Sequence, residues 1–330
     1  MINFLPSAAT PLADRILGEH LRHLRECQDV TVAAVAERLP ADLRPAPETL
    51  TAAEAGHHPL LRTTVLAGEG LALARAYGAG QHAADDWQTC VLGHQQHLAA
   101  GFTRDCFIDC GFGWPHRYQV VEERAGSILI AGSHQLPPVP LRTPAVEEAV
   151  WEFRPGARSR HHRERASLGA LPGTGCRLCQ PYSADLLTDW SAVEAWQREA
   201  HRVRTAVFAA RVRAPGAPST VVLLDEMLLH RRVGGARLHT GQMEHLAHLA
   251  ETTSLEIRVV PMSACLPNDT DRVQLDLPEG ALTVTLSEMD AVYEDLVDPR
   301  LADLLRHALE PKASLDMIRR AADGTLSTPW

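Results

Sequence analysis

Short amphipathic segments dominate the first hundred residues of this chain and most constrain its fold. Apolar residues recur at the spacing of a helix in residues 12–26, 31–39, 47–56, 64–77 and 85–99. Thr31 can cap the second segment, Pro40 ends it, and Gly56 ends the third. Because such short helices bury their apolar stripes only by packing on one another, we expect an N-terminal helical bundle.

The second half of the chain alternates between strand and helix patterns. Strand-like runs cover residues 127–132, 220–226, 255–262, 272–277 and 281–288, and the hairpin signal PEG separates the last two. Helix-like runs cover residues 144–153, 236–251, 298–308 and 312–322. The sequence therefore predicts an α+β chain, in which a helix-turn-helix-like bundle precedes a mixed α/β C-terminal domain.

Three regions follow from these patterns. We expect a helix-turn-helix-like domain over residues 1–80, a connecting helix and loop over residues 81–116, and a C-terminal α+β domain over residues 117–330. Within the third region, residues 154–191 form an elaborated segment. Its stretches RPGARSRHHRER and ALPGTGCRLCQP show neither helical nor strand periodicity.

Composition limits the class of protein. With 45% hydrophobic and 22% charged residues, the chain can bury real cores. It contains no apolar run near the ~20 residues that cross a bilayer and no signal-peptide pattern at its N-terminus, so we expect no membrane partner. Seven cysteines, an odd number, suit a reducing cytoplasm. A net charge of −9 argues against indiscriminate binding to nucleic acid.

The stretch ETLTAAEAG (residues 48–56) follows AAVAERLP at the spacing of a helix-turn-helix. Its Thr–Leu–Thr run, the later Glu and the closing Gly resemble the Xre (phage-repressor-like) family in Thr49, Leu50, Thr51, Glu54 and Gly56. The resemblance implies a DNA operator as partner and a homodimeric regulator. On this basis the candidate DNA-binding residues are Arg44, Thr49, Thr51 and Arg62.

Two features depart from that pattern. The turn between Leu39 and Thr49 holds about four residues more than the family pattern. The helix expected to read bases offers no Arg, Lys, Asn or Gln, the side chains that make bidentate contacts with bases. Residues 1–80 also hold seven Arg against nine Asp or Glu, so this region is mildly acidic.

A second resemblance covers roughly residues 117–322. The stretches VVLLDEMLLHRRVGG (221–235), LEIRVVPMSA (255–264) and LVDP (296–299) are similar to a group of antitoxin-like transcriptional regulators from antibiotic-producing bacteria. VPLRTPAVEEAV (139–150) also resembles the group, with Pro140 where a Gly is expected. The resemblance implies that this domain senses a small molecule or a small acidic partner protein.

Aromatic and histidine side chains suggest where a ligand would bind. The stretch CGFGWPHRY, which we expect to be a loop, contains Trp114, His116 and Tyr118. His239 lies on the apolar side of the predicted helix at 236–251, and these four residues are the candidate ligand-binding set. His20 and His23 lie off the apolar stripe of the first helix, so we expect them at the surface.

Seventeen histidines and seven cysteines raise the question of a metal. Cys90, His94 and His97 share one helix face and Cys106 and Cys110 form a C-x3-C pair, while Cys176 and Cys179 form a C-x2-C pair. Zinc accepts such ligands, and the two cysteine pairs together would give four thiolates. The alternatives are buried thiols and hydrogen-bonded imidazoles, so the cofactor is either zinc or none.

Catalytic motifs are missing: the chain has no phosphate-binding loop, no G-x-S-x-G and no HExxH, and no catalytic residue is assigned. Two main hypotheses remain, beside the third possibility of a protein-interaction module of the antitoxin kind. In the first, the protein is a DNA-binding transcriptional regulator that senses a small molecule or a protein partner. In the second, a regulator fold no longer reads DNA and acts as a small-molecule-binding protein or as an enzyme in a biosynthetic pathway.

Overall fold

The computed structural model describes residues 11–101, 105–133, 135–153, 190–264, 270–287 and 290–327. The described residues fall into two compact units, each treated separately below. Unit 1 lies within Met1–Glu123, Leu168–Gln197 and Met289–Asp295. Unit 2 lies within Arg124–Ser167, Arg198–Glu288 and Leu296–Trp330.

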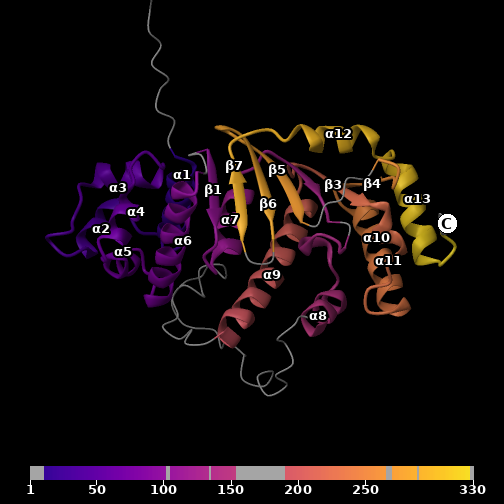
Figure 1. Cartoon of the computed structure of the whole chain (residues 1–330), viewed down its shortest axis with the longest axis horizontal. Coiled ribbons are helices and arrows are strands. Elements are labelled where there is room, and N and C mark those ends of the chain that lie inside the picture. Colours follow the sequence, from indigo (N-terminus) through magenta and orange to yellow (C-terminus); the bar gives the residue numbers. More distant parts are fainter. Residues whose placement is uncertain are drawn as a thin grey trace, which may run out of the picture. The chain divides into compact units, whose positions relative to one another are not determined.

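Unit 1 is largely helical, as the periodicity of the first hundred residues predicts (Figure 1). Its helices are α1 (Leu12–Glu26), α2 (Val32–Arg38), α3 (Pro47–Glu54), α4 (Leu60–Leu66), α5 (Gly70–Ala76), α6 (Gln81–Ala99) and α7 (Trp114–Glu123). The Thr31 side chain accepts from the Ala34 N–H at 3.2 Å, which is the expected cap of α2. The predicted helix over residues 64–77 is wrong, because the chain turns at Gly68, whose φ is +82°, and forms two helices.

Two features of unit 1 do not follow from the sequence patterns. The expected loop CGFGWPHRY is mostly helix α7. Strands β1 (Cys106–Asp109) and β7 (Ala291–Glu294) pair antiparallel, with Cys106 opposite Glu294. This pairing brings together segments far apart in the chain, a relationship that no local pattern contains.

Unit 2 is built on a mixed sheet whose strands lie in the order β6-β5-β2-β3-β4. These strands are β2 (Ser127–Ala131), β3 (Ser219–Asp225), β4 (Leu255–Val260), β5 (Asp271–Leu277) and β6 (Gly280–Leu286). β2, β3 and β4 run parallel, and β5 runs antiparallel to both β2 and β6. The predicted hairpin is confirmed, with Leu277 opposite Gly280. The expectation of an α+β chain with a mixed C-terminal sheet is confirmed.

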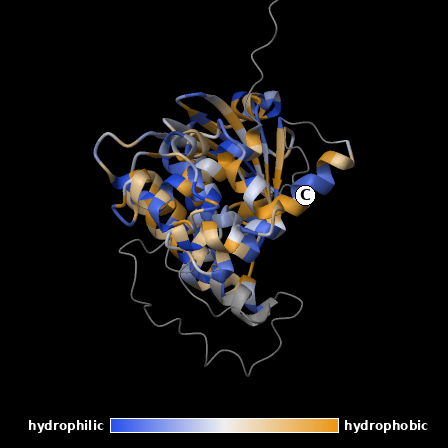
Figure 2. Ribbon diagram, turned by 90° about the vertical axis from the view of Figure 1, so that its left-hand side faces the viewer, coloured by the Kyte–Doolittle hydropathy of each residue, from blue (hydrophilic) through white to orange (hydrophobic). Residues whose placement is uncertain are grey.

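The helices of unit 2 include α8 (Pro144–Phe153), which has the predicted bounds, and residues 198–213 of α9 (Trp190–Arg213). A short 3-10 turn, η1 (Val139–Leu141), precedes α8, and the others are α10 (Glu226–His230), α11 (Ala236–Thr252), α12 (Pro299–His307) and α13 (Pro311–Ala322). In Figure 2 the helices carry both apolar and polar stretches, as elements with one buried face do. One core cluster joins the sheet to α12 through Ala131, Leu223, Val260 and Leu301.

None of the helices in the described part of the chain combines the length and the apolar character that a bilayer-spanning helix needs.

Candidate functional site

Helix α3, the predicted DNA reader, buries one face and exposes the other. Leu50 is fully buried and Ala53 nearly so. Thr51 is exposed, and its hydroxyl donates to the Pro47 carbonyl at 3.0 Å, while Thr49 is half-buried. Pro47 stands at the first helical position, where its missing N–H costs no hydrogen bond. The exposed face of α3 therefore presents small side chains and little charge.

Both arginines of the candidate DNA-binding set have partners inside unit 1. Arg62 donates from Nε and Nη2 to the two carboxylate oxygens of Asp14, at 3.2 and 2.9 Å. Asp14 is buried, so moving Arg62 to a phosphate would leave a buried carboxylate without its cation. Arg44 is exposed, and its Nη2 donates to the carbonyls of Glu37 and Leu39, each at 3.3 Å.

The residues that carry the Xre resemblance have structural roles here. Glu54 is buried and accepts from Arg25. Gly56 has φ +77°, and a Cβ there would lie 2.6 Å from the Cα of Arg15. A Cβ on Gly18 of α1 would lie 2.3 Å from the carbonyl of Ala53. These positions let α1 and α3 approach closely, so the motif describes how the bundle packs.

The expected ligand-binding residues do not form an exposed set. Trp114, His116 and Tyr118 are buried on α7, and the Tyr118 hydroxyl donates to Glu122 at 2.6 Å. His239 belongs to unit 2, where its ring bonds the backbone of Leu229 and Arg231 and burial lowers its pKa. Each of these side chains is therefore part of the buried core of its own unit.

Three histidines of unit 1 lie together, contrary to the expectation that His20 and His23 are at the surface. The ring of His116 on α7 lies 4.9 Å from that of His20 and 5.4 Å from that of His23, measured between centroids. The indole of Trp87 donates to His20 Nδ1 at 3.3 Å. His20 is fully buried because α7 covers the second face of α1.

The predicted metal ligands on α6 have other partners. The Cys90 thiol is buried, lies 3.5 Å from Asp109 Oδ1 and has its pKa raised by burial. The His94 ring packs against Phe107 at 5.2 Å, and burial lowers its pKa. Among the described residues, which include His97, Cys106 and Cys110, no group of three His, Cys, Asp or Glu could hold a metal ion.

Cys176 and Cys179 lie outside the described residues. The four-thiolate zinc site that would join them to Cys106 and Cys110 therefore stays a prediction. Cys106 and Cys110, the described half of this set, are free thiols in which burial raises the pKa. Raised pKa values favour the protonated form, whereas zinc binds the thiolate.

A buried ion network in unit 1 escaped the sequence reasoning. Arg117 of α7 donates to Asp109 from Nε at 2.6 Å and from Nη2 at 2.7 Å, and its Nη1 donates to Asp86. All three side chains are fully buried. Burial disfavours the charged guanidinium, but the charges of Asp109 and Asp86 outweigh it and raise the pKa of Arg117. The network joins α6, β1 and α7.

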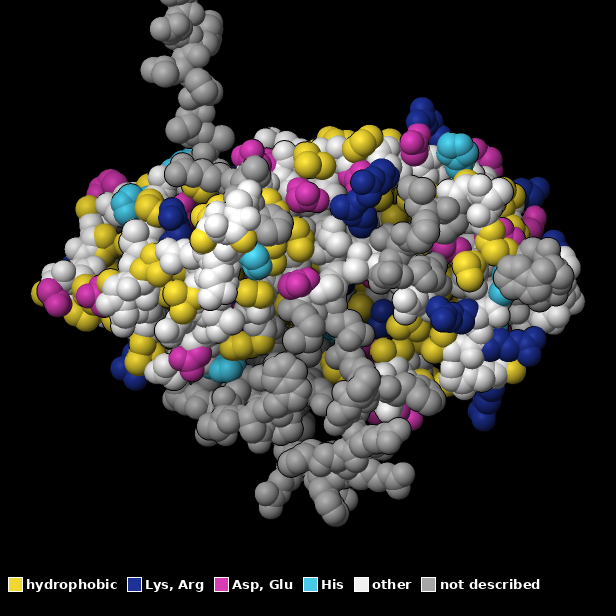
Figure 3. All heavy atoms as spheres, in the orientation of Figure 1, with side chains coloured by type: hydrophobic (Ala, Val, Ile, Leu, Met, Phe, Trp, Pro, Cys, Tyr) yellow, Lys and Arg dark blue, Asp and Glu magenta, His cyan; other side chains and the backbone are white. Residues whose placement is uncertain are grey.

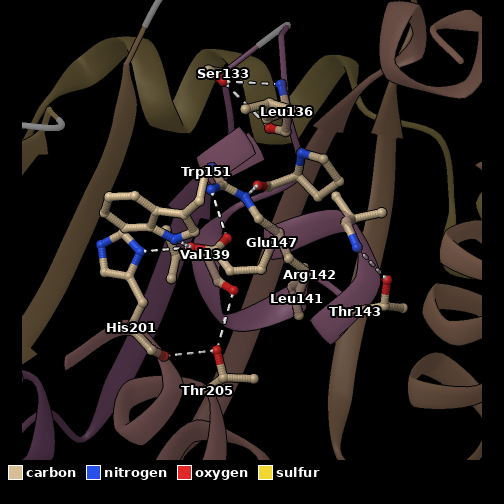
Figure 4. Close-up of polar contacts among 12 residues, drawn as sticks. Ser133, Leu136, Val139, Leu141, Arg142, Thr143, Glu147, Trp151, His201 and Thr205 are labelled. Carbon is tan, nitrogen blue, oxygen red and sulfur yellow. Dashed lines mark hydrogen bonds and ion pairs between the residues drawn. The ribbon is translucent and has the colours of Figure 1, made fainter. Parts of the chain in front are cut away.

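The candidate functional site is a polar cluster in unit 2, centred on Glu147 of α8 (Figure 4). Glu147 Oε1 accepts from the indole N–H of Trp151 at 2.7 Å and lies 2.8 Å from Nδ1 of His201. Its Oε2 accepts from Arg142 Nη1 at 3.0 Å. Burial alone would raise the pKa of Glu147, but the hydrogen bond to His201 and the charge of Arg142 lower it to about 2.

His201 is held in one orientation. Because Glu147 is ionised and can only accept, the Nδ1–H of the imidazole donates a hydrogen bond to it, so Nε2 carries the lone pair. Burial lowers the pKa of His201, which keeps the ring neutral. The ring also packs against Trp151, at 5.6 Å between centroids. This carboxylate–imidazole arrangement leaves an oriented acceptor at Nε2.

Asp271, the first residue of β5, adds a second carboxyl group to the cluster. Its Oδ1 accepts from the backbone N–H of Ser133 at 2.9 Å. Burial raises the pKa of Asp271, while the charge of Arg142, the hydrogen bond from Ser133 and the charge of Arg204 act in the opposite direction. The side chain nevertheless keeps part of its surface exposed.

The segment before α8 is fixed by side-chain hydrogen bonds, which Figure 4 shows in part. Gln242 of α11 donates to the Leu141 carbonyl at 2.7 Å and accepts from the Thr143 N–H at 2.8 Å. Arg142 Nε donates to the Pro137 carbonyl at 2.8 Å. The stretch VPLRTP, singled out in the sequence by its resemblance, therefore positions the Arg142 guanidinium.

Sequence reasoning missed the four residues Arg142, Glu147, His201 and Asp271. Arg142 and Glu147 stand within VPLRTPAVEEAV, so that stretch was a usable signal. His201 and Asp271 come from α9 and β5, and only the tertiary fold brings His201 to α8 and Asp271 to Ser133.

Comparison with known proteins identifies part of this chain. A domain of unknown function (DUF5753) matches residues 179–320, less than half of the chain, and that region is similar to the family. The match includes His201 and Asp271 and ends before the C-terminus of the chain. No match was found among curated proteins or among solved structures.

Proposed function

We propose that this protein is a homodimeric DNA-binding transcriptional regulator, in which unit 1 contacts an operator and unit 2 senses a small molecule or a partner protein. The observation that carries the proposal is the way α3 is held. α3 packs against α1, α2 and α4 through Leu50 and Ala53, while Thr51 faces solvent. A second helix supported by the first, with its outer face free, is what a helix-turn-helix needs.

The binding would depend mainly on phosphate contacts. Small side chains on α3 permit close approach to the duplex, and backbone N–H groups are suitable donors to phosphate oxygens. Each phosphate neutralised steepens the log–log salt dependence of affinity by about 0.9. A regulator of this kind acts in the cytoplasm, where Cys27, Cys90, Cys106 and Cys110 would stay free thiols.

Selection from a randomised duplex pool, followed by sequencing, tests this function. We expect enrichment of a palindromic site, since a homodimer presents two reader helices. Thr51→Glu should abolish the enrichment, because it places a negative charge against phosphate. Thr252→Glu is the matched control: Thr252 is also exposed, and its hydroxyl also donates to the carbonyl four residues earlier, at 2.7 Å.

A second function is favoured by the internal ion pairs of unit 1. Arg62 is committed to buried Asp14 and Arg44 to backbone carbonyls, so neither is a free cation. On the face drawn in Figure 3, Lys and Arg side chains are sparse over the N-terminal helices. These observations favour a small-molecule-binding protein that has kept the bundle without reading DNA. If the folded protein enriches no DNA site in the duplex selection, the result supports this second function.

A further inference from the structure

Three polar atoms of the Glu147 cluster have no hydrogen-bond partner among the described residues. They are Nη2 of Arg142, Nε2 of His201 and Oδ2 of Asp271; the other polar atoms of these side chains are bonded at 2.8 to 3.0 Å. All three side chains are only partly exposed. A donor and two acceptors, each fixed by its bonded neighbour, therefore remain available to a ligand.

The position of these groups in the sheet supports a binding role. Ser133 follows the carboxyl end of β2, and Asp271 begins β5 beside it, since Ala131 is paired with Arg272. In sheets with parallel strands, ligands bind beyond the carboxyl ends of those strands. Arg142 lies close enough to Asp271 for its charge to lower the pKa of that carboxyl, and Glu147 holds Arg142 and His201 beside each other. The three groups thus belong to one cluster near this edge of the sheet.

The opposite charges of Arg142 and Asp271 indicate which kind of ligand could bind. A ligand with only a negative charge would be repelled by the Asp271 carboxylate. A ligand with only a positive charge would be repelled by Arg142 and the buried Arg204. An apolar ligand would remove all these groups from water without replacing any hydrogen bond. A ligand that carries both charges satisfies each group.

We propose that Arg142, His201 and Asp271 bind a small amphoteric molecule, an amino acid or a close relative, through its carboxylate and its ammonium group. The carboxylate pairs with Arg142, and the ammonium group donates to Asp271 Oδ2 and His201 Nε2. Glu147 acts as a positioning residue, because it holds both Arg142 and His201. The inference rests on the sensing role proposed for unit 2 but does not require DNA.

Isothermal titration of the full chain with each proteinogenic L-amino acid tests the proposal. Acetate and ethylamine, which carry one charged group each, serve as probes of the separate halves. We expect at least one amino acid to bind with saturable heat, and neither acetate nor ethylamine to bind comparably. The proposal is overturned if no amino acid binds, or if acetate or ethylamine alone binds as tightly.

Two variants test the assigned residues. Asp271→Asn and His201→Gln should each weaken binding by at least about tenfold, since each removes a charge-assisted or oriented hydrogen bond. Asp303→Asn and His307→Gln, on the exposed part of α12, are the matched controls and should bind as the native chain does. Circular dichroism establishes that each variant folds; if Asp271→Asn does not fold, His201→Gln decides. Unchanged affinity in a folded variant overturns the assignment.

Failure of this proposal and failure of the proposed function are distinguishable. The titration contains no DNA, and the duplex selection contains no amino acid. Binding of an amino acid without operator enrichment would leave the site intact and remove the regulator function. Operator enrichment without amino-acid binding would support the regulator function and overturn the proposed amino-acid site.

Discussion

The guanidinium of Arg25 on α1 donates three hydrogen bonds to the carboxylate of Glu54 on α3, at 2.8, 2.8 and 3.0 Å. The hydroxyl of Tyr77, after α5, donates to the same carboxylate at 3.1 Å. One buried acid therefore ties together three parts of the bundle, and burial beside this acid raises the pKa of Tyr77. Glu54, the acidic residue of the helix-turn-helix pattern, therefore has a structural role in this bundle.

We expect Glu54→Ala to destabilise unit 1 by about 2 kcal/mol, because it leaves Nε of Arg25 and the buried Tyr77 hydroxyl without their acceptor. Urea unfolding of the intact chain gives the free energy, and hydrogen exchange locates the loss in α1 and α3. Glu48→Ala, on the exposed start of the same helix, should change stability by less than about 0.5 kcal/mol. Equal effects of the two substitutions would contradict this role of Glu54.

Arg117→Met should cost about 3–5 kcal/mol, because it leaves two buried carboxylates, Asp86 and Asp109, without their cation. The urea midpoint of unit 1 measures the loss. Arg75→Met, at an exposed position of α5, is the control and should be nearly neutral. A variant with the native midpoint would mean that Arg117 does not hold α6, β1 and α7 together.

Acid should destabilise unit 1 through His20. Burial lowers the pKa of this imidazole, with smaller contributions from the charges of His116, Arg117 and His23. The folded state thus binds a proton less readily than the unfolded state, so its stability is full above about pH 6.5 and falls below it. The free energy of unfolding should decrease by up to about 1.4 kcal/mol per pH unit from His20 alone.

Chemical denaturation between pH 7.5 and pH 5, approximate limits that bracket the imidazole range, measures this dependence. His20→Gln should make the slope shallower, because glutamine does not titrate and can still accept the Trp87 N–H. His58→Gln, at an exposed position of unit 1, should leave the slope unchanged. Parallel pH profiles for the native chain and His20→Gln would rule out His20 as the titrating group.

Gly18→Ala should destabilise unit 1 by about 1–3 kcal/mol. The added methyl group would lie 2.3 Å from the Ala53 carbonyl and would force α1 and α3 apart. Gly241→Ala is a matched control within helix α11, where a Cβ meets nothing within 4 Å. There alanine should stabilise by about 0.5–1 kcal/mol, since it favours the helix over the unfolded chain. A thermal melt of both variants should show midpoint shifts of opposite sign.

Much of the secondary structure could be predicted because its causes are local. The apolar spacing in residues 144–153 predicts α8 with its observed bounds, and PEG predicts the β5–β6 hairpin. Helix α7 escaped prediction, since glycine, proline and aromatic residues in CGFGWPHRY are typical of a loop. Pro115, however, stands in the first turn of α7, where proline is tolerated.

The candidate site shows the limit of local reasoning. Arg142 and Glu147 stand five residues apart, so the motif that contains them could be found in the sequence. His201 and Asp271 are separated from them by long stretches of chain. His201 reaches Glu147 because α9 packs there, and Asp271 reaches Ser133 through the β2–β5 pairing. Conversely, Cys90, His94 and His97 share a helix face, yet the fold provides thiol and ring contacts instead of a shared metal position.

The sequence by itself determined the helical start of the chain, the mixed sheet that follows and the position of α3, because spacing of apolar residues and turn residues act within a few positions. Only the tertiary structure decided the partners of individual polar groups. His20 is buried because α7 covers α1, and Arg62 meets Asp14 because α4 packs on α1. A charged group takes its properties from whatever lies within a few ångströms, and that depends on which distant segments the fold brings together.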